Sequence, residues 1–332
     1  MPCYHPISAY RIKGSKHYKT GNEVIVFNFP RGVSRSRLEN LQLPCGQCIG
    51  CRLEYSRQWA FRCLLEASYY EYNYFITLTY DDEHLPRKFS PIVDKKTGEL
   101  EELRVSYPLE KNALSAFMKR LRIEAYRKFG FDNIRFYGCG EYGSKNGRPH
   151  YHVLVFNCPI PDLVPAEKSR SGGLQYKSKF LESVWKFGRV RFSEVNFQTC
   201  AYVARYMTKK HKGEDSDYYE KNGLLPEYVR MSRRPGIASR YYHDHKDKIY
   251  HYDNFIVKNG DNAFVSKPPK YFDRMFDLDD HDSLVEIKQA RKDLAESQMQ
   301  FELLNTSKSY FQYLLVKEDV ALSKVKSLMR EL

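Results

Sequence analysis

The sequence of 332 residues contains no long apolar run and has fewer acidic side chains than basic ones, 41 against 54. No stretch approaches the roughly 20 apolar residues that a membrane helix needs. The beginning, MPCYHPISAY, lacks the basic-then-apolar layout of a signal peptide. Internal repeats and low-complexity runs are missing too. We therefore expect a globular protein of the cell interior, built as one large domain with appendages or as two domains.

The shortage of acidic residues leaves a formal net charge of +13, and aromatic residues are abundant, with 27 tyrosines and 20 phenylalanines. Cations neutralise phosphates and flat rings stack on unpaired bases, so this composition favours a nucleic acid as the partner. A soluble protein that merely has a high isoelectric point shows the same totals. Composition alone therefore does not decide between the two.

Three of the eight cysteines lie close together in the segment PCGQCIGC: Cys45, Cys48 and Cys51. In a reducing compartment, repeated C-x-x-C usually indicates a metal site, because paired thiolates close on one ion. A fourth ligand is required, and we prefer Cys3 to Cys63 and His5. The segment predicts a structural Zn²⁺ site, with an iron–sulfur cluster and unliganded thiols as the alternatives.

Hydrophobic periodicity predicts alternating strands and helices along most of the chain. In chain order we expect helix 52–70, strand 73–82, a loop with a short hairpin over 83–108, helix 110–128 ended by Gly130, strands 133–143 and 150–156, helix 174–188 ended by Gly188, strand 189–195 and helix 196–213. Beyond Gly213 we expect loops rich in tyrosine, arginine and histidine, and from about residue 280 a charged helical tail. From residue 73 the order is β-α-β-β-α-β-α, and its first six elements match an α+β, ferredoxin-like split βαβ fold with helices on one face of an antiparallel sheet.

Residues 147–156, GRPHYHVLVF, place two histidines on a predicted strand. Alternate side chains share one face of a strand, so His150 and His152 point the same way and Tyr151 points the other way. Glu141 lies on the preceding strand, and the short turn folds it back towards His150. Two imidazoles and a carboxylate can bind a divalent cation and leave one side open, as phosphodiester chemistry requires. Histidines that merely cap a strand end are the alternative. An Fe(II) oxygenase site is disfavoured by the many helices between the strands.

The segment YVARYMTKK places Tyr202 and Tyr206 four residues apart on a predicted helix, with Lys209 three residues further on. Side chains at this spacing lie on one helix face. A tyrosine hydroxyl can attack phosphorus and form a covalent phosphotyrosine link. Two such tyrosines allow a second cleavage while the first still holds its DNA end. The alternative is that both belong to the core face of an amphipathic helix.

Residues 231–242, MSRRPGIASRYY, combine arginines with a tyrosine pair on a predicted loop. Cations beside stacking rings suit a channel for single-stranded DNA, and a solvated basic loop is the alternative. The residues that we expect to contact DNA are Arg233, Arg234, Arg240 and Tyr241, with Tyr242 as their neighbour.

These motifs follow one another in a recognisable order. An apolar strand (FITLTY), a His-x-His strand and a Tyr-x-x-x-Tyr-x-x-Lys helix resemble the HUH endonucleases with two tyrosines. With PCGQCIGCR, FITLTYDDEHLP and MSRRPGIASRYY, roughly residues 40–275 are similar to replication initiators of gokushovirus-type microviruses. The resemblance implies Mg²⁺ or Mn²⁺ as cofactor, bound by His150, His152 and Glu141. It also implies nucleophilic roles for Tyr202 and Tyr206 and a charge-stabilising role for Lys209.

The resemblance further implies a rolling-circle initiator that nicks an origin in double-stranded circular DNA through a 5′-phosphotyrosine. The expected partners are single-stranded DNA, origin double-stranded DNA and the host helicase and polymerase, without a membrane, in the cytoplasm of the bacterial host cell. A DNA-binding protein that kept the fold and lost the chemistry is the alternative. The expected division is a Cys-rich N-terminal segment with a helix (1–70), an HUH endonuclease core (71–213), a basic aromatic extension that contacts DNA (214–279) and a helical tail (280–332).

Overall fold

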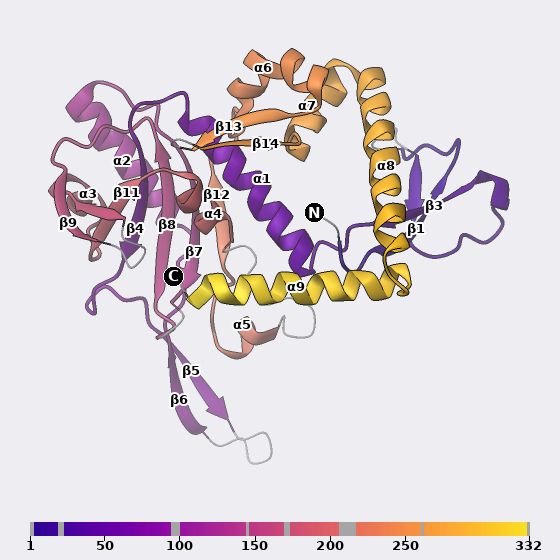
Figure 1. Cartoon of the computed structure of the whole chain (residues 1–332). Helices are drawn as coiled ribbons and strands as arrows, with labels where there is room; N and C mark the ends of the chain where they lie inside the picture. The colour runs from indigo at the N-terminus through magenta and orange to yellow at the C-terminus, as the bar shows by residue number, and fades with distance from the viewer. Residues whose placement is uncertain are drawn as a thin grey trace. The chain divides into compact units, whose positions relative to one another are not determined.

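The computed structural model describes residues 3–18, 23–93, 100–143, 146–168, 173–205, 217–259 and 262–330. The chain forms two compact units: a first unit of residues 1–55 and 289–332, and a second unit of residues 56–288. As predicted, the protein is a mixed α/β chain with a large antiparallel sheet (Figure 1). The sheet lies within the second unit.

The large sheet has seven strands in the order β12-β7-β8-β4-β11-β10-β9, and all neighbouring pairs are antiparallel. The strands span Asn73–Thr79 (β4), Arg135–Tyr142 (β7), Pro149–Phe156 (β8), Val164–Lys168 (β9), Leu174–Lys177 (β10), Val190–Glu194 (β11) and Tyr228–Met231 (β12). The four strands predicted for the core are confirmed as β4, β7, β8 and β11. Since β8 lies between β4 and β7, the histidine-bearing strand is an inner strand of the sheet.

Both faces of this sheet are covered by helices. On one face, α2 (Ala113–Phe129) and α3 (Lys179–Trp185) enclose the largest apolar core, and on the other α1 (Ile49–Ala67) and α4 (Phe197–Arg205) pack against β7 and β8 (Figure 1). The two helices of the predicted six-element unit, α2 and α3, lie on one face as expected, and the other face is covered by two helices from outside that unit. The physical reason lies in β8, whose run VLVF is apolar on both faces and requires cover on each.

Helix α2 confirms the clearest periodicity of the sequence. The apolar side chains predicted for its inner face are all buried: Leu114, Phe117, Met118, Leu121 and Ala125. The helix ends at Gly130, whose φ of 76° is the left-handed conformation that a glycine adopts easily.

Residues 174–188 form two elements, where one helix was predicted. Residues 174–177 are strand β10, in which Tyr176 lies opposite Phe192. Ser178 then begins α3, because its Oγ accepts a hydrogen bond from the Leu181 N–H at 3.1 Å. The helix ends at Trp185 and is followed by Lys186 in the left-handed region, so Gly188 is not its stop.

The expected loops beyond residue 213 are largely regular structure. Residues 83–108 do contain the predicted hairpin, of β5 (Lys88–Val93) and β6 (Leu100–Ser106). The later region, however, contains α5 (Tyr218–Lys221), β12, α6 (Ser239–Tyr252), the hairpin of β13 (Phe255–Asn259) and β14 (Asn262–Ser266), and α7 (Lys270–Asp279). Its tyrosines and phenylalanines form a further hydrophobic core together with Phe61 and Leu65 of α1; this core includes Tyr242, Tyr250, Phe255 and Phe272. Intervening charged residues hide that helical spacing in the sequence.

The first unit contains a three-stranded antiparallel sheet that the sequence did not predict. Its order is β2-β1-β3, with β1 at Ile7–Ile12, β2 at Val24–Val26 and β3 at Leu38–Leu43, and a 3₁₀ turn at Arg35–Arg37 precedes β3. The predicted helical tail is confirmed as α8 (His281–Leu304) and α9 (Tyr310–Arg330). None of the helices in the described part of the chain has the length and apolar character to span a membrane.

Candidate active site

The β7–β8 hairpin brings the three predicted cation ligands together. Glu141 lies directly opposite His150 in the pairing of the two strands, so their side chains share a face. Glu141 Oε1 is 2.6 Å from His150 Nε2 and 3.0 Å from His152 Nε2. One ligand atom from each of the three residues lies within 4.8 Å of the others, which is a spacing that a single metal ion can bridge.

In both histidines Nδ1 contacts another residue, and this leaves Nε2 facing Glu141. His150 Nδ1 is 3.2 Å from the carbonyl oxygen of Arg148. A carbonyl oxygen only accepts, so a neutral His150 carries its proton on Nδ1 and has a lone pair on Nε2. That lone pair faces a carboxylate oxygen at 2.6 Å, and two acceptors at this distance repel unless a proton or a cation lies between them. The N, N, O donor set therefore fits a divalent cation.

Burial gives this group an inner and an outer side. The side chains of Glu141 and His152 are 3% and 5% exposed, whereas that of His150 is 18% exposed. Burial raises the pKa of Glu141, but hydrogen bonds and charge from the two histidines lower it by more than burial raises it. The pKa of Glu141 therefore lies below the ordinary value. Glu141 is consequently an ionised carboxylate at neutral pH, and His150 forms the more exposed side of the group.

Tyr202, on α4, packs directly against this group. Its ring centroid is 5.1 Å from that of His152 and 5.8 Å from that of Phe75, both edge-to-face. Phe75 in turn stacks on His152 at 5.3 Å. One of the two predicted nucleophiles therefore lies on the same sheet face as the predicted metal ligands. Tyr206 and Lys209 lie outside the described residues.

Two further residues hold the histidines, and the sequence did not single out these contacts. Thr77 lies opposite His152 in the β4–β8 pairing, and its Oγ1 is 3.0 Å from His152 Nδ1. Arg148, whose carbonyl contacts His150, is fixed by bonds from its guanidinium to Asp82 Oδ1 at 2.5 Å and to the Tyr80 carbonyl at 3.1 Å. In the sequence, the alternation of residues along β4 could have indicated Thr77, because it places every second residue of the strand on the histidine face.

Tyr151, between the histidines, points to the opposite face as predicted. Its hydroxyl accepts a hydrogen bond from the Glu110 N–H at 3.0 Å and lies 3.1 Å from the Tyr80 hydroxyl. Its ring covers Gly140, where an added Cβ would come within 3.1 Å of the ring carbons. Glycine at this position thus lets the tyrosine pack flat and fixes β8 against β7.

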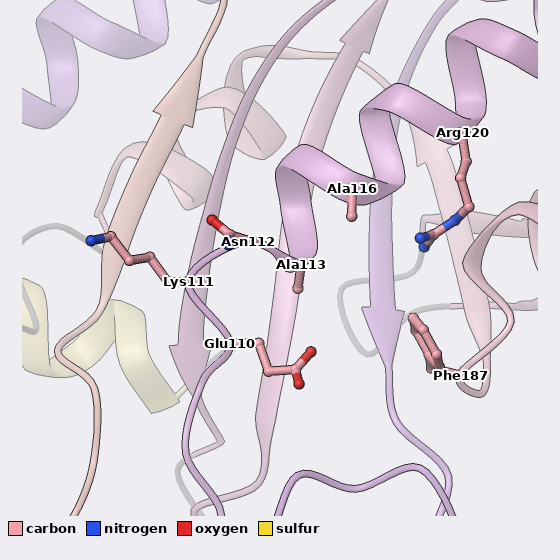
Figure 2. Close-up of a pocket in the computed structure, with 7 residues that line it drawn as sticks. All are labelled: Glu110, Lys111, Asn112, Ala113, Ala116, Arg120 and Phe187. Carbon is pink, nitrogen blue, oxygen red and sulfur yellow. The ribbon is translucent and has the colours of Figure 1, made fainter.

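A cavity of about 400 Å³ lies on the α2 side of the sheet, and Figure 2 shows the side chains around it. It is lined by Glu110, Lys111, Asn112, Ala113, Ala116, Arg120 and Phe187. Arg120 is already engaged, because its Nε donates to the Val184 carbonyl at 2.8 Å. The histidines face the other side of the sheet, so this cavity is separate from the candidate site.

The three arginines that we expect to contact DNA are exposed. Arg233 and Arg234 lie in the turn between β12 and α6. Arg240, in the first turn of α6, lies over the ring of Tyr69 at 4.4 Å and has its Nε 3.7 Å from Asp244 Oδ2. Arg233 and Arg234 are therefore accessible to a phosphate, whereas Arg240 has protein partners.

The two tyrosines of this segment differ in accessibility. Tyr241 is half-buried and stacks on His245 at 4.1 Å. Tyr242 is fully buried, and its hydroxyl donates to Asp279 Oδ2 at 2.8 Å. The predicted loop is thus a turn over residues 232–238 that leads into α6 at Ser239, and the ring of Tyr242 is part of the core instead of a stacking surface.

The first unit contains a second group with the geometry of a metal site, formed by Cys3, Cys45, Cys48 and Cys51. The sulfur atoms of all four lie within 4.8 Å of one another. The other two ligands considered from the sequence lie elsewhere: Cys63 is buried in the core of the second unit, and His5 contacts Glu318 at 2.5 Å. The structure therefore brings together the four cysteines that were predicted.

Backbone N–H groups point at the cysteine sulfurs. The N–H groups of Cys45 and Cys48 donate to the sulfurs of Cys3 and Cys45 at 3.2 and 3.3 Å, and that of Tyr4 donates to the sulfur of Cys48 at 3.4 Å. Although burial raises it, the N–H groups of Cys51 and Tyr4 lower the pKa of the Cys48 thiol to about 7. These hydrogen bonds favour the thiolate of Cys48, which is the form that binds metal, whereas burial raises the pKa of the Cys3 and Cys51 thiols.

Comparisons with known proteins give consistent matches. Residues 73–211 match the family model for replication-associated protein ORF2/G2P. Replication-associated protein ORF2 of Spiroplasma virus 4 is 32% identical over 340 residues, covering 100% of this chain and 98% of the relative. Replication-associated protein VP4 of Bdellovibrio phage phiMH2K is 27% identical, covering 94% and 90%. Replication-associated protein ORF4 of Chlamydia phage 1 is 32% identical, covering 54% and 41%. No solved structure gives a significant match.

Proposed function

The chain belongs to the family of replication-associated proteins of microviruses, and we propose that it initiates rolling-circle replication by nicking and rejoining phage DNA. Membership of the family supports a role in phage replication. The nicking chemistry is our proposal. It rests on the packing of Tyr202 against His152, with ring centroids 5.1 Å apart, because a nucleophile and a metal ligand that act on one phosphate must be neighbours.

The elements β4-α2-β7-β8-α3-β11 form the proposed HUH endonuclease core. Their strands are adjacent in the order β7-β8-β4-β11, and α2 and α3 cover one face. This arrangement is expected of a ferredoxin-like split βαβ unit, in which β4 and β7 are parallel and β8 is inserted between them. It supports the assignment of the histidine strand to the centre of a nicking site.

Glu141, His150 and His152 are the residues that would hold Mg²⁺ or Mn²⁺. A divalent cation held by these residues would supply Lewis-acid polarisation of a phosphoryl oxygen of the scissile phosphodiester. The hydroxyl oxygen of one tyrosine, Tyr202 or Tyr206, attacks the phosphorus, and the bond from phosphorus to the 3′ oxygen breaks. The products are a 5′-phosphotyrosine and a free 3′-OH that primes synthesis.

The second tyrosine completes the cycle. It cleaves the regenerated origin, and the newly released 3′-OH displaces the first tyrosine from phosphorus and closes a single-stranded circle. Lys209 would stabilise the negative charge on the pentacovalent phosphorus. The proposed partners are single-stranded DNA, the double-stranded origin and the host helicase and polymerase, in the cytoplasm of the bacterial host. The accessible side chains of Arg233 and Arg234 support contact with a phosphate backbone.

The test is formation of a covalent adduct between the protein and DNA. Single-stranded oligonucleotides tiled over the phage genome and labelled at the 3′ end are incubated with protein and Mn²⁺, then separated on a denaturing gel. We expect one oligonucleotide to become covalently attached to the protein, because the tyrosine retains the 5′ phosphate of the labelled fragment.

The variants separate the roles of the residues. The double variant Tyr202→Phe with Tyr206→Phe should form no adduct, whereas Tyr126→Phe, which removes the hydroxyl of an exposed tyrosine on α2, should react like the wild type. An adduct that persists in the double variant would refute the tyrosine mechanism. Specific DNA binding without an adduct at any concentration of Mg²⁺ or Mn²⁺ would favour the non-catalytic alternative.

A further inference from the structure

We propose that Cys3, Cys45, Cys48 and Cys51 bind one Zn²⁺, and that this ion is the core around which the first unit folds. The site is independent of the nicking chemistry, because its ligands all lie in the first unit and the Glu141–His150–His152 group lies in the second.

The distances between the sulfurs fit a single ion. A tetrahedral site with zinc–sulfur bonds of about 2.3 Å places neighbouring sulfurs about 3.8 Å apart. Cys48 Sγ is 3.9 Å from Cys3 Sγ, and all four sulfurs lie within 4.8 Å of one another. An iron–sulfur cluster distributes its thiolates over several iron atoms and therefore needs a wider spacing. The geometry thus favours one tetrahedral ion.

The backbone around the sulfurs provides the hydrogen bonds that a charged thiolate site needs. Four thiolates around a dication carry a net charge of about −2, which N–H donors offset. Gly46 has a φ of 73°, and this left-handed residue turns the chain so that the N–H groups of Gln47 and Cys48 both point at Cys45 Sγ, at 3.4 and 3.3 Å. Cys51 adds to this charge balance, since it lies in the first turn of α1, near the positive end of the helix dipole.

The first unit has few apolar residues that could replace such a core. Within residues 3–18, 23–55 and 289–326, the buried hydrophobic residues are Tyr4, Ala9, Cys48 and Leu314. Ile7 and Ile25, on the strands of the small sheet, remain 43% and 40% exposed. A unit of this size with so small a core needs an additional cross-link, which is usually a disulfide or a bound metal ion. The cysteines of this unit form no disulfide, so a metal ion is the cross-link that they can provide.

The apolar residues that are buried pack on the cysteines themselves. Tyr4 and Leu314 form one cluster with Cys48, and Tyr310 and Ala321 of α9 pack against that cluster. His5 also reaches α9, through the 2.5 Å contact with Glu318. Binding of zinc therefore orders the N-terminal segment, the Cys45–Cys51 turn and α9 together, and its loss should release all three.

The experiment uses the full-length protein purified in reducing buffer without a chelator, with its metals measured by mass spectrometry. We expect about one zinc per chain, lost in Cys3→Ser and kept in His5→Ala and Cys63→Ala, which change the two rejected ligand candidates. Cys3→His should retain zinc, because three cysteines and a histidine also form a structural site, so a loss in Cys3→Ser cannot be attributed to misfolding alone.

Trypsin then tests the role in folding. After zinc is removed with a mercurial reagent and a chelator, we expect cleavage within residues 3–55 and 289–330 to become about tenfold faster, while residues 56–288 stay protected. Re-addition of zinc should restore protection. Stoichiometric iron with absorbance above 300 nm, or zinc retained in Cys3→Ser, would overturn the assignment of the site. An unchanged cleavage pattern without zinc would overturn its role as a core. None of these readings depends on DNA or on whether the protein nicks it.

Discussion

Replacing Thr77 by valine tests whether the strand next to the histidines tunes the proposed cation site. A neutral imidazole that offers Nε2 to a metal carries its proton on Nδ1, and for His152 the partner of that N–H is Thr77 Oγ1 at 3.0 Å. Valine keeps the branched shape and the strand preference of threonine but removes this oxygen. The substitution therefore perturbs one hydrogen bond and leaves the backbone of β4 intact.

The expected size of the effect follows from burial. His152 has a side chain that is only 5% exposed, so water cannot easily replace the lost acceptor. Loss of such an outer hydrogen bond typically weakens metal binding about 10- to 100-fold. This corresponds to about 1.4 to 2.8 kcal/mol of binding free energy. Leaving the buried N–H unsatisfied also costs about 1–3 kcal/mol of folding free energy, so a somewhat lower melting temperature is expected.

The measurement is Mn²⁺ affinity, by calorimetric titration of the protein without DNA. Thr77→Ser keeps an oxygen on Cβ and should bind Mn²⁺ nearly as well as the wild type. Thr79→Val is the matched control, because Thr79 shares the histidine face of β4 but its hydroxyl donates to the Arg189 carbonyl at 3.1 Å and not to a histidine. Equal Mn²⁺ affinity in Thr77→Val and the wild type would refute the reasoning that Thr77 sets the tautomer of His152.

Three further predictions concern stability, DNA binding and metal removal. Glu66→Ala should lower the free energy of unfolding in urea by about 3–5 kcal/mol, because it leaves the buried guanidinium of Arg135 without its carboxylate partner. Glu124→Ala, which breaks an exposed helical ion pair, should change it by less than about 0.5 kcal/mol, and equal effects would contradict the burial argument. Arg233→Ala with Arg234→Ala should reduce the slope of log affinity against log salt for single-stranded DNA by about 1.4, at about 0.7 per phosphate contact, and an unchanged slope would remove these arginines from the interface. Finally, EDTA should abolish adduct formation and Mn²⁺ should restore it, whereas an adduct that forms fully in EDTA would exclude a role for the cation.

Local patterns explain which parts of the fold were predictable. The spacing of Leu114, Phe117 and Leu121 repeats within a few residues, so α2 could be located from the sequence. Glu141 could be assigned beside His150 because a short turn joins their strands. Both features depend on neighbours along the chain, and the structure agrees with them.

Contacts between distant segments set the remaining features, and the sequence carried little signal for these. The pairing of Thr77 with His152 depends on the register between β4 and β8, which are joined through α2 and β7. The alternation of β4 disfavours a shift of one residue, but a shift of two residues would keep Thr77 on the histidine face and place it opposite another residue, and no local pattern excludes that shift. In α6 and α7, residues such as Tyr242 and Phe272 form a core with each other and with distant residues such as Phe61 of α1, so their spacing looked like that of a loop with charged residues.

The position of Cys3, the fourth cysteine of the metal group, also depends on the register between two strands. The sequence offered Cys3, Cys63 and His5 as partners of the Cys45–Cys51 turn, and a separation of 42 residues between Cys3 and Cys45 says nothing about distance. In the structure β1 pairs with β3 so that Ile7 lies opposite Leu43. Continuing this antiparallel register towards the N-terminus leads Cys3 to the turn that begins at Cys45. The small sheet therefore selects the fourth ligand, and the proposed zinc in turn secures the end of the sheet, so neither should form fully without the other.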